Sequence, residues 1–195
     1  MTKKLFAITG GIGSGKSLVL SALKDAGFLT LSSDQIVSEL YKTHKVKVLL
    51  KEMFPSAVSG QKHLTINRAE IAKQVFFDKD KHKALTSTIT PLVLQKILNK
   101  AKTLNKPLFV EVPLLFECGY QNHFDGVIVV MRDMKERIES VKVRSNLSQD
   151  QILARMKNQV DYDALDKTPY TIITNDCDIL TLKERTIKLA NELIK

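Results

Sequence analysis

A glycine-rich octapeptide near the start of the chain most constrains its fold: Gly10-Gly11-Ile12-Gly13-Ser14-Gly15-Lys16-Ser17. It matches the pattern G-x-x-x-x-G-K-[ST] of a phosphate-binding loop. The apolar residues 4–9 before it predict a buried strand, and residues 18–23 after it predict a helix. A plain glycine-rich turn between a strand and a helix would explain the glycines alone. The lysine and the order of the elements instead predict a site for a nucleoside triphosphate.

The octapeptide is expected to bind ATP through its main chain and two of its side chains. Glycines let successive N–H groups point at phosphate oxygens, and the N-terminus of the next helix adds partial positive charge. Lys16 supplies a full charge to the β- and γ-phosphates, and the Ser17 hydroxyl is the expected Mg²⁺ ligand. The predicted ATP-binding residues of this segment are Gly11, Ile12, Gly13, Ser14, Gly15, Lys16, Ser17 and Leu18. A dinucleotide fingerprint is excluded, because its third glycine would fall on Lys16.

The composition is that of an ordinary soluble protein with a sizeable core. The 195 residues are 44% hydrophobic and 26% charged, which suits one α/β domain with or without a lid. No apolar run approaches the roughly 20 residues that span a bilayer, and no signal peptide is expected, so we predict a cytoplasmic location. Cys118 and Cys177 show neither metal-ligand nor redox spacing and are expected to be reduced thiols.

The formal net charge of +9 is typical of a protein that handles polyanions. Nucleic acid is one such partner, and ATP with a phosphorylated co-substrate is another. The lysines are spread along the chain, with no basic run beside aromatic residues of the kind that marks a nucleic-acid surface. We therefore expect small phosphorylated substrates, with neither a nucleic acid nor a membrane as partner.

Strands and helices are predicted to alternate along most of the chain. Apolar runs predict strands over residues 4–9, 28–31, 107–112, 125–131 and 170–174. Helical spacing predicts helices over residues 18–23, 35–42, 134–143, 148–159 and 180–194. This alternation predicts an α/β fold with a doubly wound, five-stranded parallel sheet.

Residues 45–105 interrupt this alternation and are predicted to be almost wholly helical. Helices are expected over residues 47–53, 67–77 and 79–104, the last kinked or broken near Pro91, with a loop and no strand over residues 54–66. We interpret the span as a helical insertion that forms a wall of the acceptor site. The expected organisation is one unit with a core (1–43, 106–133 and 162–195), an acceptor-binding insertion (44–105) and a lid (134–161).

Asp34 follows the second predicted strand directly, in the sequence Ser32-Ser33-Asp34. In an open parallel sheet, ligands bind beyond the carboxyl ends of the strands, which is also where the phosphate loop lies. A catalytic carboxylate and a helix N-cap are both consistent with this position, since Asp and Ser are preferred caps. The residues alone leave these two roles open.

Several segments together resemble one family. Besides the loop and Asp34, they are Val112-Pro113-Leu114-Leu115-Phe116-Glu117, Arg155-Met156-Lys157-Asn158-Gln159 and Asn175 after the fifth strand. In this order they resemble the dephospho-coenzyme A kinases, and the resemblance covers nearly the whole chain. It implies a P-loop kinase fold with a nucleotide-binding core, an acceptor domain and a lid. It also implies transfer of the ATP γ-phosphoryl group, with Mg²⁺, to the 3′-hydroxyl of dephospho-coenzyme A.

The resemblance also implies roles for individual residues. Asp34 is the expected general base, with Lys16 and Arg144 as the other catalytic residues, and Asn175 is expected to contact ATP. The acceptor-binding residues expected are Asp34, Arg68, Leu114, Leu115 and Glu117. A solvated charge for Arg144, a surface charge for Glu117 and a structural ion pair for Arg68 are the alternatives. A monomer or a weak homo-oligomer is expected.

The chain departs from the family pattern in three segments. The family commonly has Asp-Ala-Asp where this chain has Ser32-Ser33-Asp34, and a Glu and a His where it has Thr86 and Thr90. In the lid, the first of two family arginines falls on Ser140, which leaves Arg144. Arg137, one helical turn earlier on the same face, is a candidate to replace it.

Three functions are consistent with these observations. The first is the dephospho-coenzyme A kinase. The second is a P-loop kinase for another small hydroxyl or nucleoside monophosphate acceptor, which the substituted positions would favour. The third is a nucleotide-dependent switch without transfer activity, which the presence of Asp34 disfavours.

Overall fold

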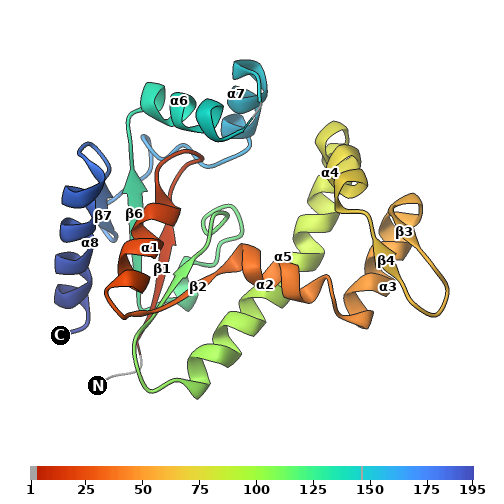
Figure 1. Ribbon diagram of the computed structural model, residues 1–195, viewed down its shortest axis with the longest axis horizontal. Coiled ribbons are helices and arrows are strands. Elements are labelled where there is room, and N and C mark those ends of the chain that lie inside the picture. Colours follow the sequence, from red (N-terminus) through yellow and green to blue (C-terminus); the bar gives the residue numbers. More distant parts are fainter. Residues whose placement is uncertain (1–3, 146) are drawn as a thin grey trace. The chain divides into compact units, whose positions relative to one another are not determined.

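A five-stranded parallel sheet forms the core of the unit that contains residues 1–32 and 101–195 (Figure 1). The computed structural model describes residues 4–145 and 147–195. The strands are β1 (Leu5–Thr9), β2 (Leu29–Ser32), β5 (Leu108–Glu111), β6 (Gly126–Met131) and β7 (Thr171–Thr174). Their order across the sheet is β2-β5-β1-β6-β7, and each neighbouring pair is parallel. The predicted fold class is therefore confirmed.

The apolar runs that form the inner strands β1, β5 and β6 are buried on both faces, whereas the edge strands β2 and β7 are partly exposed. All five residues of β1 and all four residues of β5 are buried, as continuous apolar runs in a parallel sheet predict. The chain enters β1 in the middle of the sheet, then adds β2 and β5 on one side and β6 and β7 on the other. The direction of winding thus reverses at β1, and ligands of such sheets bind at that point, beyond the carboxyl ends of the strands.

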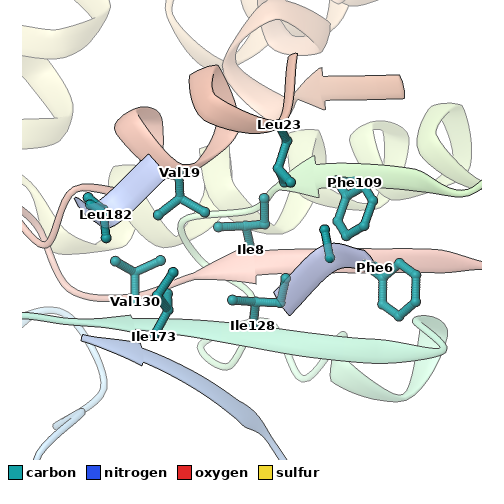
Figure 2. Close-up of a cluster of buried hydrophobic side chains, with 10 residues drawn as sticks. Phe6, Ile8, Val19, Leu23, Phe109, Ile128, Val130, Ile173 and Leu182 are labelled. Carbon is teal, nitrogen blue, oxygen red and sulfur yellow. The ribbon is translucent and has the colours of Figure 1, made fainter. Parts of the chain in front are cut away.

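Helices α1 (Lys16–Asp25) and α8 (Ile179–Leu193) share one hydrophobic core with the sheet. Figure 2 shows Val19 and Leu23 of α1 and Leu182 of α8 against the side chains of four strands. Phe6 and Phe109 stack with ring centroids 5.0 Å apart on neighbouring strands. The cluster consists of Phe6, Ile8, Val19, Leu23, Phe109, Ile128, Val130, Ile173, Leu182 and Ala190. It anchors both ends of the phosphate loop, because that loop joins β1 to α1.

Helices α6 (Met134–Arg144) and α7 (Gln149–Lys157) make up most of the predicted lid. Side-chain caps fix where each helix begins. The Asp133 carboxylate accepts from the first N–H groups of α6, and Ser148 forms a capping box with Gln151 at the start of α7. In Figure 1 these two helices lie beside the loop between β1 and α1. Contacts divide the chain into two units, and the lid helices belong to the unit that contains the sheet.

The second unit, Ser33–Lys100, is mostly helical. Its elements are α2 (Ser33–Leu40), α3 (His44–Met53), a 3₁₀ turn (Pro55–Ala57), β3 (Val58–Ser59), β4 (Thr65–Ile66), α4 (Arg68–Phe77) and α5 (Lys79–Thr103), the last of which ends beyond Lys100. Among residues 4–145 and 147–195, no helix has both the length and the apolar character of a membrane span.

One prediction about this region was wrong, and of the kink or break expected near Pro91 the break does not occur. The segment expected to be only loop contains the antiparallel pair β3 and β4, whose two-residue strands are too short to leave a periodic pattern. Helix α5 also continues through Pro91 without a break. Ile89, Val93 and Ile97 are buried along one face, so packing on both sides of the proline holds the helix together despite the missing N–H.

Candidate active site

The phosphate loop occupies the space between the end of β1 and the start of α1. Gly15 is the N-cap of α1 with φ of 101°, a left-handed conformation that favours glycine. A Cβ atom at this position would lie 2.4 Å from the side-chain nitrogen of Asn175. Gly15 therefore allows both the turn into the helix and the close approach of β7, and the loop N–H groups of residues 16–18 lie at the helix N-terminus, where anions bind.

Asn175, predicted to contact ATP, holds the loop from the end of β7. Its side-chain amide donates to Ser14 O at 2.9 Å, and its main-chain N–H donates to Met131 O at 2.8 Å. The residue is only 5% exposed. These bonds give Asn175 a supporting role beneath the loop, and they explain why an asparagine at this position belongs with a phosphate-binding loop 161 residues away.

Lys16 is buried with its charge inside the loop. Its Nζ donates to Gly10 O at 2.8 Å and Gly11 O at 3.0 Å, and the residue is 8% exposed. Burial lowers the pKa of Lys16 from 10.5 to about 8, the charge of Glu111 opposes that shift, and the charges of Arg137 and Arg144 add to it. Glu111 and Glu117 supply some negative charge near this cation and the two arginines, and phosphate groups would supply more.

Glu111 is a site residue that the sequence analysis missed. It is the last residue of β5, is 8% exposed, and accepts a hydrogen bond from the Ser17 hydroxyl at 3.2 Å. These two side chains present oxygen atoms, which Mg²⁺ prefers. Within the described residues no group of three His, Cys, Asp or Glu could hold a metal by itself. The pair fits a Mg²⁺ ion that is held partly by substrate phosphates, as is usual in phosphoryl-transfer enzymes.

The segment that follows α7 contacts the loop and its supports. The Gln159 side-chain oxygen accepts from Ile12 N at 2.7 Å, and the Tyr162 hydroxyl lies 3.1 Å from the Thr9 hydroxyl. Burial raises the pKa of Tyr162 to about 12, so this hydroxyl stays protonated at neutral pH. Gln159 was noted only as part of a family motif, and its partner lies 147 residues away in the chain.

Arg137 and Arg144, both in helix α6 of the lid, differ in environment. Arg137 is 9% exposed, and its Nε donates to Ile12 O at 3.1 Å. Arg144, the predicted catalytic arginine, is the last residue of α6 and is exposed. Both are close enough for their charges to lower the pKa of Lys16. Positive charge from α6 therefore reaches the site from two positions.

The comparisons with known proteins agree with this geometry. The family model of dephospho-CoA kinase matches residues 4–181. The chain belongs to the dephospho-CoA kinase family. A dephospho-CoA kinase of Thermus thermophilus is 33% identical over 94% of this chain and 88% of its own length. One of Streptococcus agalactiae is 27% identical over 97% and 99%.

Solved structures show the same fold over nearly the whole length. A Thermus thermophilus crystal structure is 30% identical, with a TM-score of 0.83 over 98% of both chains. The dephospho-CoA kinase of Campylobacter jejuni is 26% identical, with a TM-score of 0.70 over 100% of this chain and 98% of that one. A shikimate kinase of Acinetobacter baumannii, 9% identical with a TM-score of 0.56, shares the fold of P-loop kinases.

Residues 112–117 after β5 carry the dephospho-CoA kinase motif. They form mainly turns, and none of these six residues is exposed. Leu115 is completely buried, and Leu114 is partly buried. Glu117 accepts from Val160 N at 3.0 Å, and its other carboxylate oxygen is buried without a hydrogen-bond partner among the described residues. Glu117 thus joins this turn to the end of the lid segment.

The other predicted acceptor-binding residues belong to the second unit. Asp34 lies exposed in the first turn of α2, and its carboxylate forms no hydrogen bond with a described residue. The N-cap alternative therefore has no support from its contacts. Arg68, which was given an ion pair as its alternative, instead donates to the Ser38 hydroxyl at 3.2 Å and lies over the Tyr41 ring at 5.1 Å.

Proposed function

We propose that this chain transfers the γ-phosphoryl group of ATP to the 3′-hydroxyl of dephospho-CoA and releases CoA and ADP. The observation that supports this most is the buried Lys16 inside a phosphate loop of a chain that the dephospho-CoA kinase model matches from residue 4 to residue 181. Phosphoryl transfer needs positioning and charge compensation more than covalent chemistry by the protein. The loop, Lys16 and the lid arginines supply both.

Loop amides and Lys16 hold the β- and γ-phosphates in this proposal. The lysine already lies inside the loop, and its Nζ, which now donates to two main-chain carbonyls, exchanges these bonds for phosphate oxygens when ATP binds. Arg144, exposed at the end of α6, compensates charge on the phosphates. Ser17 and Glu111 would hold Mg²⁺, which would neutralise part of the phosphate charge.

Asp34 is the proposed general base. Its exposed carboxylate accepts the proton of the acceptor hydroxyl as the new bond from that oxygen to the γ-phosphorus forms. The bond between the γ-phosphorus and the bridging oxygen of ADP breaks in the same step, and ADP leaves with that electron pair. Arg68, Leu114, Leu115 and Glu117 are the proposed acceptor-site residues. The burial of Leu115 and the hydrogen bond of Glu117 to Val160 N support a role in shaping the site for these two residues.

Both proposed substrates are small and water-soluble, and we further propose a cytoplasmic enzyme that acts as a monomer or weak homo-oligomer. Its partners would be ATP, dephospho-CoA and Mg²⁺, without nucleic acid or membrane.

An acceptor panel tests the proposal. The purified chain is supplied with ATP, Mg²⁺ and either dephospho-CoA, adenosine or a nucleoside monophosphate, and ADP release is followed. We expect rapid ADP release only with dephospho-CoA, and CoA as the product by mass spectrometry. Lys16→Ala is the control, with turnover lower by at least about 10²-fold because it removes the charge at the phosphates. Faster transfer to another acceptor would favour the second function, in which the substitutions at Ser32, Thr90 and Ser140 have reshaped the site.

A further inference from the structure

Two lid side chains hold the apex of the phosphate loop through a single residue. Ile12 N–H donates to Gln159 at 2.7 Å, and Ile12 O accepts from Arg137 Nε at 3.1 Å. Both the main-chain N–H and the main-chain carbonyl of Ile12 thus form hydrogen bonds with residues more than a hundred positions away in the chain. The loop apex therefore has a fixed position relative to α6.

The loop leaves room for this approach because it carries glycine where Arg137 packs. A Cβ on Gly11 would lie 2.2 Å from Arg137 Nη2 and 2.5 Å from its Cζ. Gly11 does not have a positive φ, so backbone conformation does not demand glycine at this position. The guanidinium group lies directly against the loop backbone, and a glycine is the residue that permits it.

Arg137 is a buried cation without an anionic partner. It is 9% exposed, and among residues 4–145 and 147–195 it forms no ion pair. Of its five N–H donors only the one on Nε has a hydrogen-bond acceptor among the described residues. Burying an unpaired charge is costly, so such an arginine needs a compensating anion. Arg137 and Lys16 both face the loop, where their charges influence each other.

We propose that Arg137 is a ligand of the ATP phosphates, held in place for that purpose by its bond to Ile12 O. The free Nη groups match phosphate oxygens in geometry and charge. The inference takes its ligand, ATP, from the proposed function.

Four variants test the inference: Arg137→Ala, Arg137→Lys, Arg137→Gln and the control Lys142→Ala. Lys142 lies on the same helix but is paired with Glu139. Binding of the non-hydrolysable analogue AMP-PNP with Mg²⁺ is measured by calorimetry without any acceptor, so the result does not depend on which acceptor the enzyme uses. We expect Arg137→Ala to weaken binding by about 10- to 100-fold, and Lys142→Ala to leave it unchanged.

The lysine and glutamine variants separate a phosphate ligand from a support of the loop. Lysine keeps the positive charge, whereas glutamine keeps an N–H donor for Ile12 O without the charge. Recovery of part of the binding by Arg137→Lys and not by Arg137→Gln supports the inference. Wild-type binding by Arg137→Gln or Arg137→Ala would overturn it, because a donor alone or no donor would then suffice. If Arg137→Ala does not fold, the comparison of the other two variants still decides the question.

Discussion

The Ser17 hydroxyl donates to the Glu111 carboxylate across 3.2 Å and so joins the first turn of α1 to the end of β5. Ser17 belongs to the phosphate loop, and Glu111 lies beside β1 in the sheet, opposite Ile8. This contact brings a carboxylate to the position where a metal bound to the ATP phosphates would lie.

Replacement of Glu111 tests this relationship. Glu111→Gln keeps an acceptor oxygen for Ser17 but removes the negative charge. We expect turnover to fall by about 10-fold or more and the Mg²⁺ concentration for half-maximal activity to rise, because a carboxylate near the metal is lost. The measurement is initial rate against Mg²⁺ concentration at fixed ATP. Glu136→Gln, an exposed carboxylate paired with Arg132, is the control. An unchanged Mg²⁺ dependence in Glu111→Gln would show that Glu111 only supports the loop.

The parts of the protein that could be predicted are those whose structure depends on residues adjacent in the sequence. The phosphate loop could be predicted because eight consecutive residues, with a strand before and a helix after, carry its chemistry. The strands could be predicted because burial on both faces leaves continuous apolar runs. Their bounds shifted by only a residue or two, as with β2, predicted over 28–31 and found over Leu29–Ser32.

Long-range contacts account for what the sequence did not predict. Glu111 accepts a hydrogen bond from Ser17, which lies 94 residues earlier in the chain. The sequence indicated a role for Glu111 only by placing a carboxylate at the end of an apolar strand. Nothing in the pattern of α6 shows that Arg137 is buried while Arg144 is exposed, since burial depends on where the helix docks. The hairpin of β3 and β4 was missed because each strand has two residues.

The lowered pKa of Lys16 predicts a pH dependence for ATP capture. Burial brings the pKa to about 8, so the free enzyme loses this positive charge as the pH rises above 8. We expect kcat/KM for ATP to fall above that pH, because kcat/KM reports the free enzyme. Bound phosphates favour the charged lysine, so kcat should hold to higher pH. Rate profiles from about pH 6.5 to 9.5 check this, within the range where a lysine of such pKa titrates. Parallel profiles of kcat and kcat/KM would contradict it.

The same shift predicts how folding stability changes with pH. The pKa of Lys16 is about 8 in the folded protein and 10.5 ordinarily, so between these values the unfolded chain binds more protons. The contribution of Lys16 to the free energy of unfolding should therefore rise as the pH rises through this window. In Lys16→Met this rise should be absent. Urea unfolding of both proteins at several pH values checks the difference, and identical pH dependences would refute it.

Gln159 is predicted to position the loop apex. Gln159→Met keeps the length of the side chain but removes the acceptor of Ile12 N–H. Loss of one hydrogen bond should raise KM for ATP by about 2- to 10-fold with a smaller change in kcat. The amide proton of Ile12 should also shift in a ¹⁵N-labelled sample, since it loses its acceptor. Gln149→Met, at the exposed start of α7, is the control. An unmoved Ile12 resonance would rule out the positioning role.

Asp34 decides between a kinase and a protein that only binds nucleotide. Asp34→Asn keeps the size of the side chain but removes the proton acceptor, a contribution of about 10² to 10⁴-fold in rate. Its carboxylate forms no hydrogen bond with a described residue, so the melting temperature should hardly change. ATP binding depends on the loop and should persist.

Calorimetry with ATP, together with the rate of transfer to dephospho-CoA, gives the two quantities needed. Glu39→Gln, which removes another exposed carboxylate of α2, controls for the loss of negative charge on that helix. Retained ATP affinity with transfer nearly abolished in Asp34→Asn, and not in Glu39→Gln, would support Asp34 as the general base, whereas normal transfer in Asp34→Asn would exclude it.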